Sequence, residues 1–406
     1  MFHSRDKSAL LVRSIYDSHM KKRAIVVFLL ATLATTALAG LPINAAPSNQ
    51  PCKFGGEFKV TSGKLSACLW VNGNGTWIQY PKRNEKSLNT YEKTKLKAYQ
   101  EVQKLYAPGP LKSISLNYDI SENFPIVLKQ SYINQTQRAS QFYDIFFTQP
   151  TIVNAYYQTE KDEKYLSSHP ILSRDSESFQ SWFTDWKKGK SLEHNIGLVA
   201  SYFTSNGKTE GHTGVLVGAQ SSEKTLRLYS EQVVAHEYFH VVQDFYKYSS
   251  DQLGYEGNDG FDRYYPPIFR EGSANTISFA VSMKSFEDYI LFYQIFLSEN
   301  KGKYAPAIFN SLTSNAKVIS ALKLIEKKSN SPDAHWAAYP IGALVFEWLI
   351  AEYGIEGYKR IIRNQELGKP FAENLKISVG ISLDQLYRKA APHVLAGFKA
   401  AKGTTL

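Results

Sequence analysis

The segment VVAHEYFHVVQDF at residues 233–245 constrains the fold more than any other part of the chain. Its apolar residues recur at helical spacing, so that Val234, Tyr238, Val241 and Phe245 form one face of a helix. Because the segment is mostly apolar, we expect this helix to be buried. It also carries a polar stripe with two histidines, and buried polar groups need partners. The fold must therefore supply partners for that stripe.

A metal ion bound by His236 and His240 would satisfy the stripe. Histidines four residues apart on a helix point to the same side, and Zn–N bonds of about 2.0–2.1 Å are then geometrically feasible. Glu237 would face the same cavity without binding the metal and could take a proton from a metal-bound water. The alternative is that both histidines are structural residues with ordinary hydrogen-bond partners.

Two histidines do not complete a catalytic zinc site, which usually has three protein ligands and a water. The pattern HExxHxxGxxH would supply a third histidine, but Gln243 and Tyr246 occupy the positions of its glycine and last histidine. We expect the third ligand to be Glu271, near the start of a second helix in PPIFREGSANTISFA. Asp259 and Asp262 are the alternative ligands. Glu271 could instead be a first-turn glutamate that the helix dipole favours.

The motifs AHEYFHVVQ and FREGSA together resemble the gluzincin metallopeptidases, the group within the peptidase MA-like clan that includes thermolysin. The resemblance implies one Zn²⁺ ion on His236, His240 and Glu271, with Glu237 as the general base. In layout it covers roughly residues 113–400, but only these two motifs are specific. The interval between His240 and Glu271 is longer than in the best-known members, so we expect a long loop there, near the mouth of the cleft.

The same resemblance suggests residues that support the ligands. Asn275 lies one turn after Glu271, where related enzymes place a carboxylate that orients a ligand histidine. Asp244, one turn after His240, is the alternative. Either residue could equally be an ordinary polar residue of its helix.

A donor for the developing oxyanion is also expected. The segment AHWAAYPIGALVFEWLIAEYG resembles the later helix that presents a tyrosine in this clan, and Tyr339 is the candidate. Tyr264 and Tyr265 are its rivals. The strand GHTGVLVGAQ before the metal helix is expected beside the cleft, where an extended peptide could add to an edge strand. No Gly-x-Met-Glu-Asn motif precedes His236, which argues against an aminopeptidase of that type.

The N-terminus has the layout of a secretory signal. Met20-Lys21-Lys22-Arg23 precedes the apolar stretch AIVVFLLATLATTALAG. Ala37-Leu38-Ala39 at the end of that stretch and Asn44-Ala45-Ala46 after it are small-residue cleavage patterns. We therefore predict that residues 1–46 form a signal peptide, with Met20 a candidate for the true start. An uncleaved transmembrane anchor is the alternative. The predicted location is secreted or extracytoplasmic, in association with the cell envelope.

Cys52 and Cys68 are the two cysteines of the chain, and in an exported protein we expect them to form a disulfide bond. Residues 51–80 contain short β-type runs separated by glycine turns, which predicts a small β-hairpin module. Residues 81–112 are expected to be a linker with one helix. The metallopeptidase domain is predicted to span residues 113–406.

The pattern within that domain changes along the chain. Strand-like segments alternate with helical ones up to about residue 230, and helical periodicity then prevails. We therefore expect an α+β, zincin-like fold with a mixed α/β N-terminal lobe and a helical C-terminal lobe. The formal charge is +10, of which +4 lies in residues 1–46 (six basic minus two acidic residues), and no basic run is interleaved with aromatics. Nucleic acid is therefore not an expected partner.

Taken together, these features predict an exported zinc peptidase that acts on a peptide or protein substrate. A cell-surface binding protein that keeps the fold without turnover is the first alternative. A zinc hydrolase of a non-peptide amide is the second. Intact Glu237 argues against the first, because a protein without catalysis has no need for the base.

Overall fold

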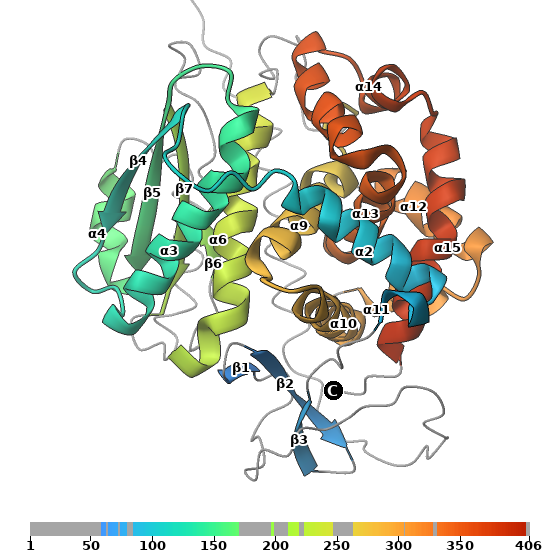
Figure 1. Ribbon diagram of the computed structural model, residues 1–406, viewed down its shortest axis with the longest axis horizontal. Helices are drawn as coiled ribbons and strands as arrows, with labels where there is room; N and C mark the ends of the chain where they lie inside the picture. Colours follow the sequence, from blue (N-terminus) through green and yellow to red (C-terminus); the bar gives the residue numbers. More distant parts are fainter. Residues whose placement is uncertain are drawn as a thin grey trace, which may run out of the picture.

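The computed structural model describes residues 58–61, 64–71, 74–78, 84–169, 196–198, 210–218, 223–246, 263–303, 305–327 and 331–402. Within these ranges the protein is mixed α and β, mostly helical, with a small and mainly parallel sheet (Figure 1). The strands are β1 (Phe58–Thr61), β2 (Lys64–Val71), β3 (Asn74–Ile78), β4 (Ile114–Ile120), β5 (Thr151–Thr159), β6 (Ile196–Leu198) and β7 (Glu210–Val217). The helices are α2 (Thr90–Gln103), α3 (Ile126–Tyr143), α4 (Glu163–Ser168), α6 (Glu223–Tyr246), α9 (Pro267–Ser282), α10 (Phe286–Lys303), α11 (Pro306–Ser311), α12 (Asn315–Lys327), α13 (Pro332–Arg363), α14 (Phe371–Val379) and α15 (Leu383–Lys402).

The sheet that precedes α6 in the sequence has the strand order β4-β5-β7-β6. β4, β5 and β7 are parallel, and β6 is antiparallel to β7. Alternate residues of β5 and β7, including Tyr157 and Val215, pack with Leu128 of α3 and Val234 of α6. This packing fixes α6 against one face of the sheet. The expectation that β7 is the edge strand is wrong, because β7 lies between β5 and β6, and β6 takes that edge.

The helical elements share one core with α3 and α6. Ala139 of α3, Phe239 of α6, Ile277 of α9, Leu344 of α13 and Ala390 of α15 all belong to it. Figure 1 shows the sheet with α3 and α4 on one side of α6, and α9, α13 and the later helices on the other. α6 therefore lies between the sheet and the helical part, and from Gln232 to Tyr246 every residue except Val233 and Asp244 is buried.

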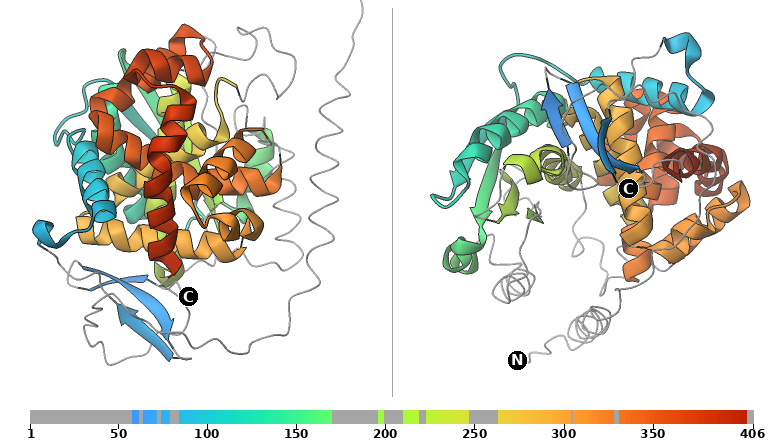
Figure 2. Two further views of the ribbon diagram at one scale, coloured as in Figure 1. Left: turned by 90° about the vertical axis from the view of Figure 1, so that its right-hand side faces the viewer. Right: turned by 90° about the horizontal axis from the view of Figure 1, so that it is seen from below.

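α2 belongs to this core as well. Asn89 begins the helix with a capping box, in which its side chain accepts from the backbone N–H of Glu92 and the Glu92 carboxylate accepts from that of Asn89. Ala98 and Val102 are buried in the main core. The helix that the sequence pattern assigned to a linker thus packs against α13 as part of the same body (Figure 2).

Within residues 51–80, where a small hairpin module was predicted, the described residues form the antiparallel sheet β1-β2-β3. Figure 1 shows it at one end of the molecule, close to α10. Cys52 lies outside the described residues, and no side-chain placement is described for Cys68, so their disulfide bond stays a prediction. The predicted signal peptide at residues 1–46 also lies outside the described residues.

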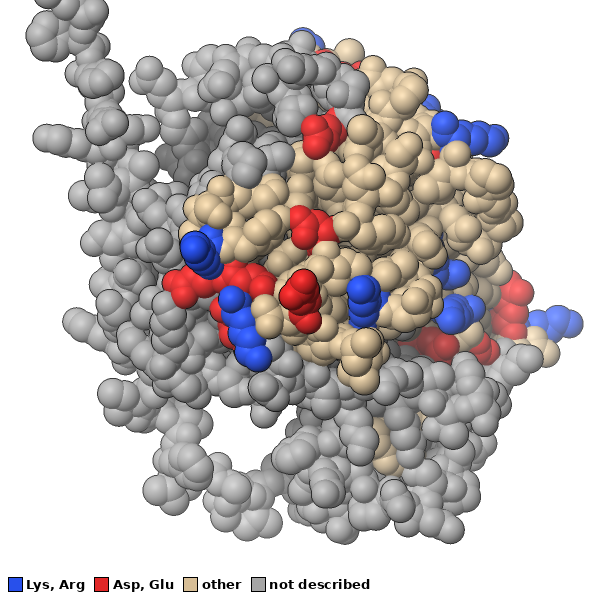
Figure 3. Space-filling view, turned by 90° about the vertical axis from the view of Figure 1, so that its left-hand side faces the viewer, with Lys and Arg blue, Asp and Glu red and all other residues tan. Residues whose placement is uncertain are grey.

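No helix within the described residues combines the length and the apolarity needed to cross a bilayer. On the face of the molecule that carries the sheet, the described Lys and Arg residues are intermixed with Asp and Glu (Figure 3). The expectations about partners and location remain predictions.

Candidate metal centre

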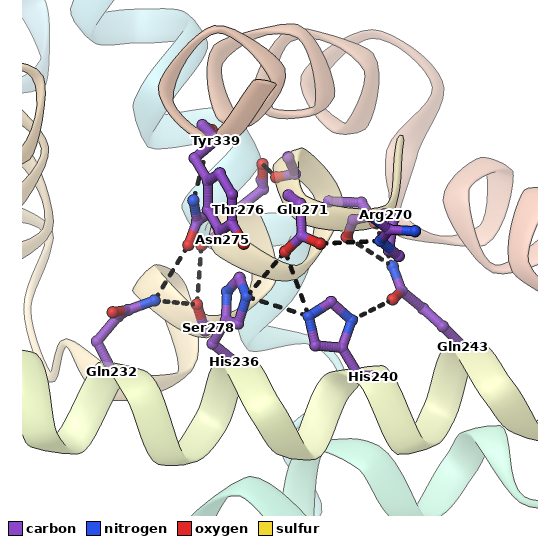
Figure 4. Close-up of polar contacts among 12 residues, drawn as sticks. Gln232, His236, His240, Gln243, Arg270, Glu271, Asn275, Thr276, Ser278 and Tyr339 are labelled. Atoms are coloured by element: carbon purple, nitrogen blue, oxygen red, sulfur yellow. Dashed lines mark hydrogen bonds and ion pairs between the residues drawn. The ribbon is translucent and has the colours of Figure 1, made fainter. Parts of the chain in front are cut away.

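α6 and α9 carry the candidate ligands on facing sides. His236 and His240 are one turn apart on α6, and Glu271 lies in the second turn of α9, opposite them (Figure 4). α9 begins sharply because Pro267 stands at its first turn, where a missing N–H costs nothing. All three side chains are buried, with residue exposures of 5% each.

The close crossing of α9 and α13 completes the site. Gly272, next to Glu271, faces Gly342 of α13 so closely that an added Cβ would lie 2.4 Å from the Gly342 Cα. Only two glycines permit this backbone approach. Because Tyr339 is one turn before Gly342, the crossing carries its ring toward the ligands. The tyrosine ring is stacked on His236, with 6.0 Å between the ring centroids and 16° between the planes.

The three ligand atoms form a nearly equilateral triangle. The Nε2 atoms of His236 and His240 are 3.1 Å apart, and each is 3.4 Å from Oε2 of Glu271. Four ligands at about 2.0–2.1 Å from a tetrahedral zinc ion are about 3.3–3.4 Å apart. The spacing of the three atoms therefore fits one zinc ion bound by one oxygen and two nitrogens, with the fourth position left for water.

The charge state of Glu271 agrees with a ligand role. Burial acts to raise the pKa of its carboxyl, but the two histidines and Arg270 outweigh burial and hold that pKa well below its usual range. The Nε atom of Arg270 donates to Oε1 of Glu271 at 2.8 Å. This contact leaves Oε2 directed at the two histidines, so the carboxylate presents a single oxygen to a metal.

Glu237, which follows His236 on α6, is a buried carboxyl group beside the candidate ligands. It is 8% exposed, and its Oε2 atom has no hydrogen-bond partner among the described residues. Burial raises the pKa of its carboxyl to about 7, with His236 acting to lower it and Glu271 to raise it. A carboxyl group with a pKa near neutrality can both accept and return a proton at physiological pH.

Tyr339 is half-buried and lies among charged neighbours. Burial raises the pKa of its hydroxyl well above the ordinary value, and the carboxylates of Glu271 and Glu237 raise it further. The hydroxyl therefore stays protonated and can donate a hydrogen bond. Its rivals Tyr264 and Tyr265 pack against the main core, the second of them against Phe269.

The residues predicted to orient the histidines have other described contacts. The Oδ1 atom of Asn275 accepts from Gln232, and its Nδ2 atom donates to the backbone oxygen of Tyr339. The Nδ1 atom of His236 has no hydrogen-bond partner among the described residues. Asp244 is half-buried on α6. The orienting roles of Asn275 and Asp244 stay predictions.

Two residues near the ligands were not predicted as part of the site. Gln243 accepts a hydrogen bond at Oε1 from Nδ1 of His240, at 2.7 Å. Arg270 binds the outer oxygen of Glu271, as described above. Sequence signals could have identified both residues. Gln243 stands three residues after the candidate ligand His240 on the same helix, and Arg270 stands directly before the candidate ligand Glu271. The alternative ligands Asp259 and Asp262 lie outside the described residues.

Two buried histidines and a buried glutamate on adjoining helices define a candidate zinc site of the kind that peptidases use. Beside it, the Oε2 atom of Glu237 has no hydrogen-bond partner among the described residues. A family model matches residues 85–357, and the chain belongs to that family, DUF5700, whose description reads "Putative zinc dependent peptidase". The matched region runs from before α2 into α13 and includes every ligand candidate. No curated protein and no solved structure matches the chain.

Proposed function

We propose that this protein is an exported zinc peptidase of the gluzincin type, with His236, His240 and Glu271 as the ligands of one zinc ion. The single observation that carries the proposal is the triangle of ligand atoms, with sides of 3.1, 3.4 and 3.4 Å. Family membership supports the same class of activity. Two neutral imidazoles and a carboxylate are a donor set that zinc prefers.

The residues around the ligands have the roles that hydrolysis of a peptide bond requires. When bound, zinc supplies a Lewis acid that lowers the pKa of a water molecule and polarises a carbonyl group. Glu237 takes a proton from the attacking water at its unpaired oxygen and returns it to the leaving amine. Tyr339 donates its hydroxyl proton in a hydrogen bond to the oxyanion that forms.

Export is proposed on the sequence pattern of residues 1–46 alone. N-terminal sequencing of protein purified from the culture medium and from the cell envelope tests it. A mature chain that begins shortly after Ala39 or Ala46 would support a cleaved signal. An intact N-terminus in the membrane fraction would indicate an anchor, and an intact soluble chain inside the cell would contradict export.

The experiment that tests the ligand set is a metal analysis of the purified chain by elemental mass spectrometry. Wild type is expected to hold about one zinc ion per chain. Glu271→Gln should lose most of it, because the amide carries no charge, whereas the matched variant Glu237→Gln should keep it. Folded wild type without zinc would contradict the proposal. A zinc content of Glu271→Gln equal to that of wild type would indicate that the third ligand is Asp259 or Asp262.

Peptidase activity needs a separate assay, because zinc binding alone does not identify the substrate. Wild type and Glu237→Gln are compared on a library of short peptides and on a set of non-peptide amides. Cleavage of peptides by wild type alone supports the proposal. Cleavage of amides without cleavage of peptides would identify a different hydrolase, and zinc without any turnover would identify a binding protein.

A further inference from the structure

We propose that Gln243 is a positioning residue that fixes the ring and the tautomer of His240, so that the Nε2 lone pair of His240 faces the metal position. The inference rests on the proposed zinc site and deepens it. Gln243 is not one of the three proposed ligands. Its proposed role is to fix the tautomer and the ring orientation of the ligand His240.

The first observation is the contact between the two side chains. Gln243 lies three residues after His240 on α6, and its Oε1 atom is 2.7 Å from Nδ1 of the imidazole. Residues three apart on a helix are neighbours on its surface, so this contact is built into the helix. Gln243 is 3% exposed, and water therefore competes little for the bond.

The second observation fixes which end of the amide faces the ring. The Nε2 atom of Gln243 lies 3.0 Å from the backbone oxygen of Arg270 and 2.9 Å from Oγ of Ser273. A backbone carbonyl can only accept hydrogen bonds, so the amide must turn its NH₂ group toward Arg270. Rotating the amide by half a turn would place two acceptor oxygens against each other. The carbonyl end of Gln243 must then face His240.

The orientation of the amide determines the tautomer of the imidazole. Facing an acceptor oxygen, Nδ1 of His240 must carry a proton. In the neutral ring the lone pair is then on Nε2, which points at His236 and Glu271. A hydrogen bond to one ring nitrogen is the usual means by which proteins select the nitrogen that binds a metal.

The same amide also spans the two helices that carry the ligands. Its donor end binds Arg270 and Ser273, which flank Glu271 and Gly272 on α9, and its acceptor end binds a ligand of α6. Gln243 therefore sets the ring of His240 relative to the turn that carries the third ligand. His236 differs, because its Nδ1 atom has no partner among the described residues.

The test distinguishes the effect of Gln243 on the His240 tautomer from its effect as a link between α6 and α9. Gln243→Leu removes both, whereas Gln243→Glu keeps an acceptor for Nδ1 and loses the NH₂ donors. Gln232→Leu is the matched control, because Gln232 is a buried glutamine on the same helix whose amide binds Asn275 and Ser278 of α9 and no histidine. The zinc dissociation constant of each full chain is measured by competition with a chelator, and the imidazole N–H protons are followed by NMR on ¹⁵N-histidine-labelled protein.

We expect the zinc Kd of Gln243→Leu to rise about 10–100-fold, with loss of the protected Nδ1–H signal of His240. Gln243→Glu should keep that signal and stay within about tenfold of wild type, and Gln232→Leu should keep wild-type affinity. Wild-type affinity in Gln243→Leu, or equal losses in Gln243→Leu and Gln232→Leu, would overturn the inference. So would a loss in Gln243→Glu as large as in Gln243→Leu.

Failure of the proposed function is distinguishable from failure of this inference. A wild-type chain that binds no zinc contradicts the proposed function, and the NMR signal then still decides whether Gln243 holds the His240 tautomer. A wild-type chain that binds zinc as tightly as Gln243→Leu contradicts only the role of Gln243.

Discussion

Gly272 of α9 and Gly342 of α13 are in backbone contact, at the point where the helix of the candidate ligand Glu271 crosses the helix of Tyr339. A Cβ added at Gly272 would lie 2.4 Å from the Cα of Gly342, and one added at Gly342 would lie 2.6 Å from the backbone oxygen of Ile268. Neither neighbour can move without displacing a helix. This contact sets the distance between the ligands and the proposed oxyanion donor.

Gly272→Ala is expected to destabilise the protein by about 1–3 kcal/mol through overpacking at this crossing. Gly397→Ala is the matched control, because its new methyl group would meet mainly the flexible side-chain ends of Leu344. That substitution also gains helix propensity. Denaturant unfolding measures both variants, and a stability of Gly272→Ala equal to or above that of Gly397→Ala would contradict the steric account.

Glu237→Gln is expected to keep the zinc ion and to lose at least about 10²-fold in kcat, because the amide cannot accept the proton of the attacking water. Steady-state kinetics on a cleaved peptide, with zinc content measured on the same sample, checks this. Turnover at the wild-type rate by a zinc-loaded variant would refute the assignment of the base.

Tyr339→Phe is expected to lower kcat by about 10²–10³-fold with little change in KM, because the lost hydrogen bond forms only as the oxyanion develops. The rival Tyr264→Phe should turn over at close to the wild-type rate. If Tyr264→Phe lost activity and Tyr339→Phe kept it, the donor would belong to the loop before α9 instead of α13.

Stability should fall in acid because of a buried charge cluster formed by Lys95, Glu347 and His393. Burial lowers the pKa of His393 below 6.5, more than the Glu347 contact raises it. Burial acts to raise the pKa of Glu347, but Lys95 and His393 outweigh it and hold the pKa below 4.5. At both groups the unfolded chain takes up protons more readily than the folded chain.

The free energy of unfolding is therefore expected to decrease as the pH falls below 6.5 and again below 4.5. Urea unfolding at pH 7.5, 6.0 and 5.0 would measure the first part, with His393→Gln as the control that cannot titrate at this position. The variant should show a shallower decrease across this range. Identical slopes in variant and wild type would exclude His393 as the cause.

The grouping of the candidate ligands was predictable because their geometry is local. Two histidines at helical spacing share a face whatever surrounds them, and the FREGSA motif identified Glu271 by resemblance. Gln243 was missed because its orientation depends on a backbone oxygen 27 residues further along the chain. The three-residue spacing from His240 is a local signal, but no sequence pattern predicts the contact of Gln243 with the backbone oxygen of Arg270.

The placement of α2 could not be predicted for a similar reason. Lys95 has no signal of burial in its surroundings, yet its side chain is fully buried and its Nζ atom is 2.7 Å from Glu347. A lysine in a helix ordinarily indicates a solvent-exposed position. Its partner lies 252 residues away, so only the folded structure shows that α2 belongs to the same core as α13.

The cluster around Glu347 also bears on how the chain can assemble. One carboxylate of α13 accepts from Lys95 of α2 and pairs with His393 of α15, so the first and last helices of the core meet on it. A nascent chain can satisfy this carboxylate only when almost all of its sequence has been synthesised. Contacts so distant in sequence slow folding, and domains built on them are exposed to degradation and aggregation while incomplete. A fragment that stops at residue 357, where the family match ends, would lack His393 and leave part of this core open.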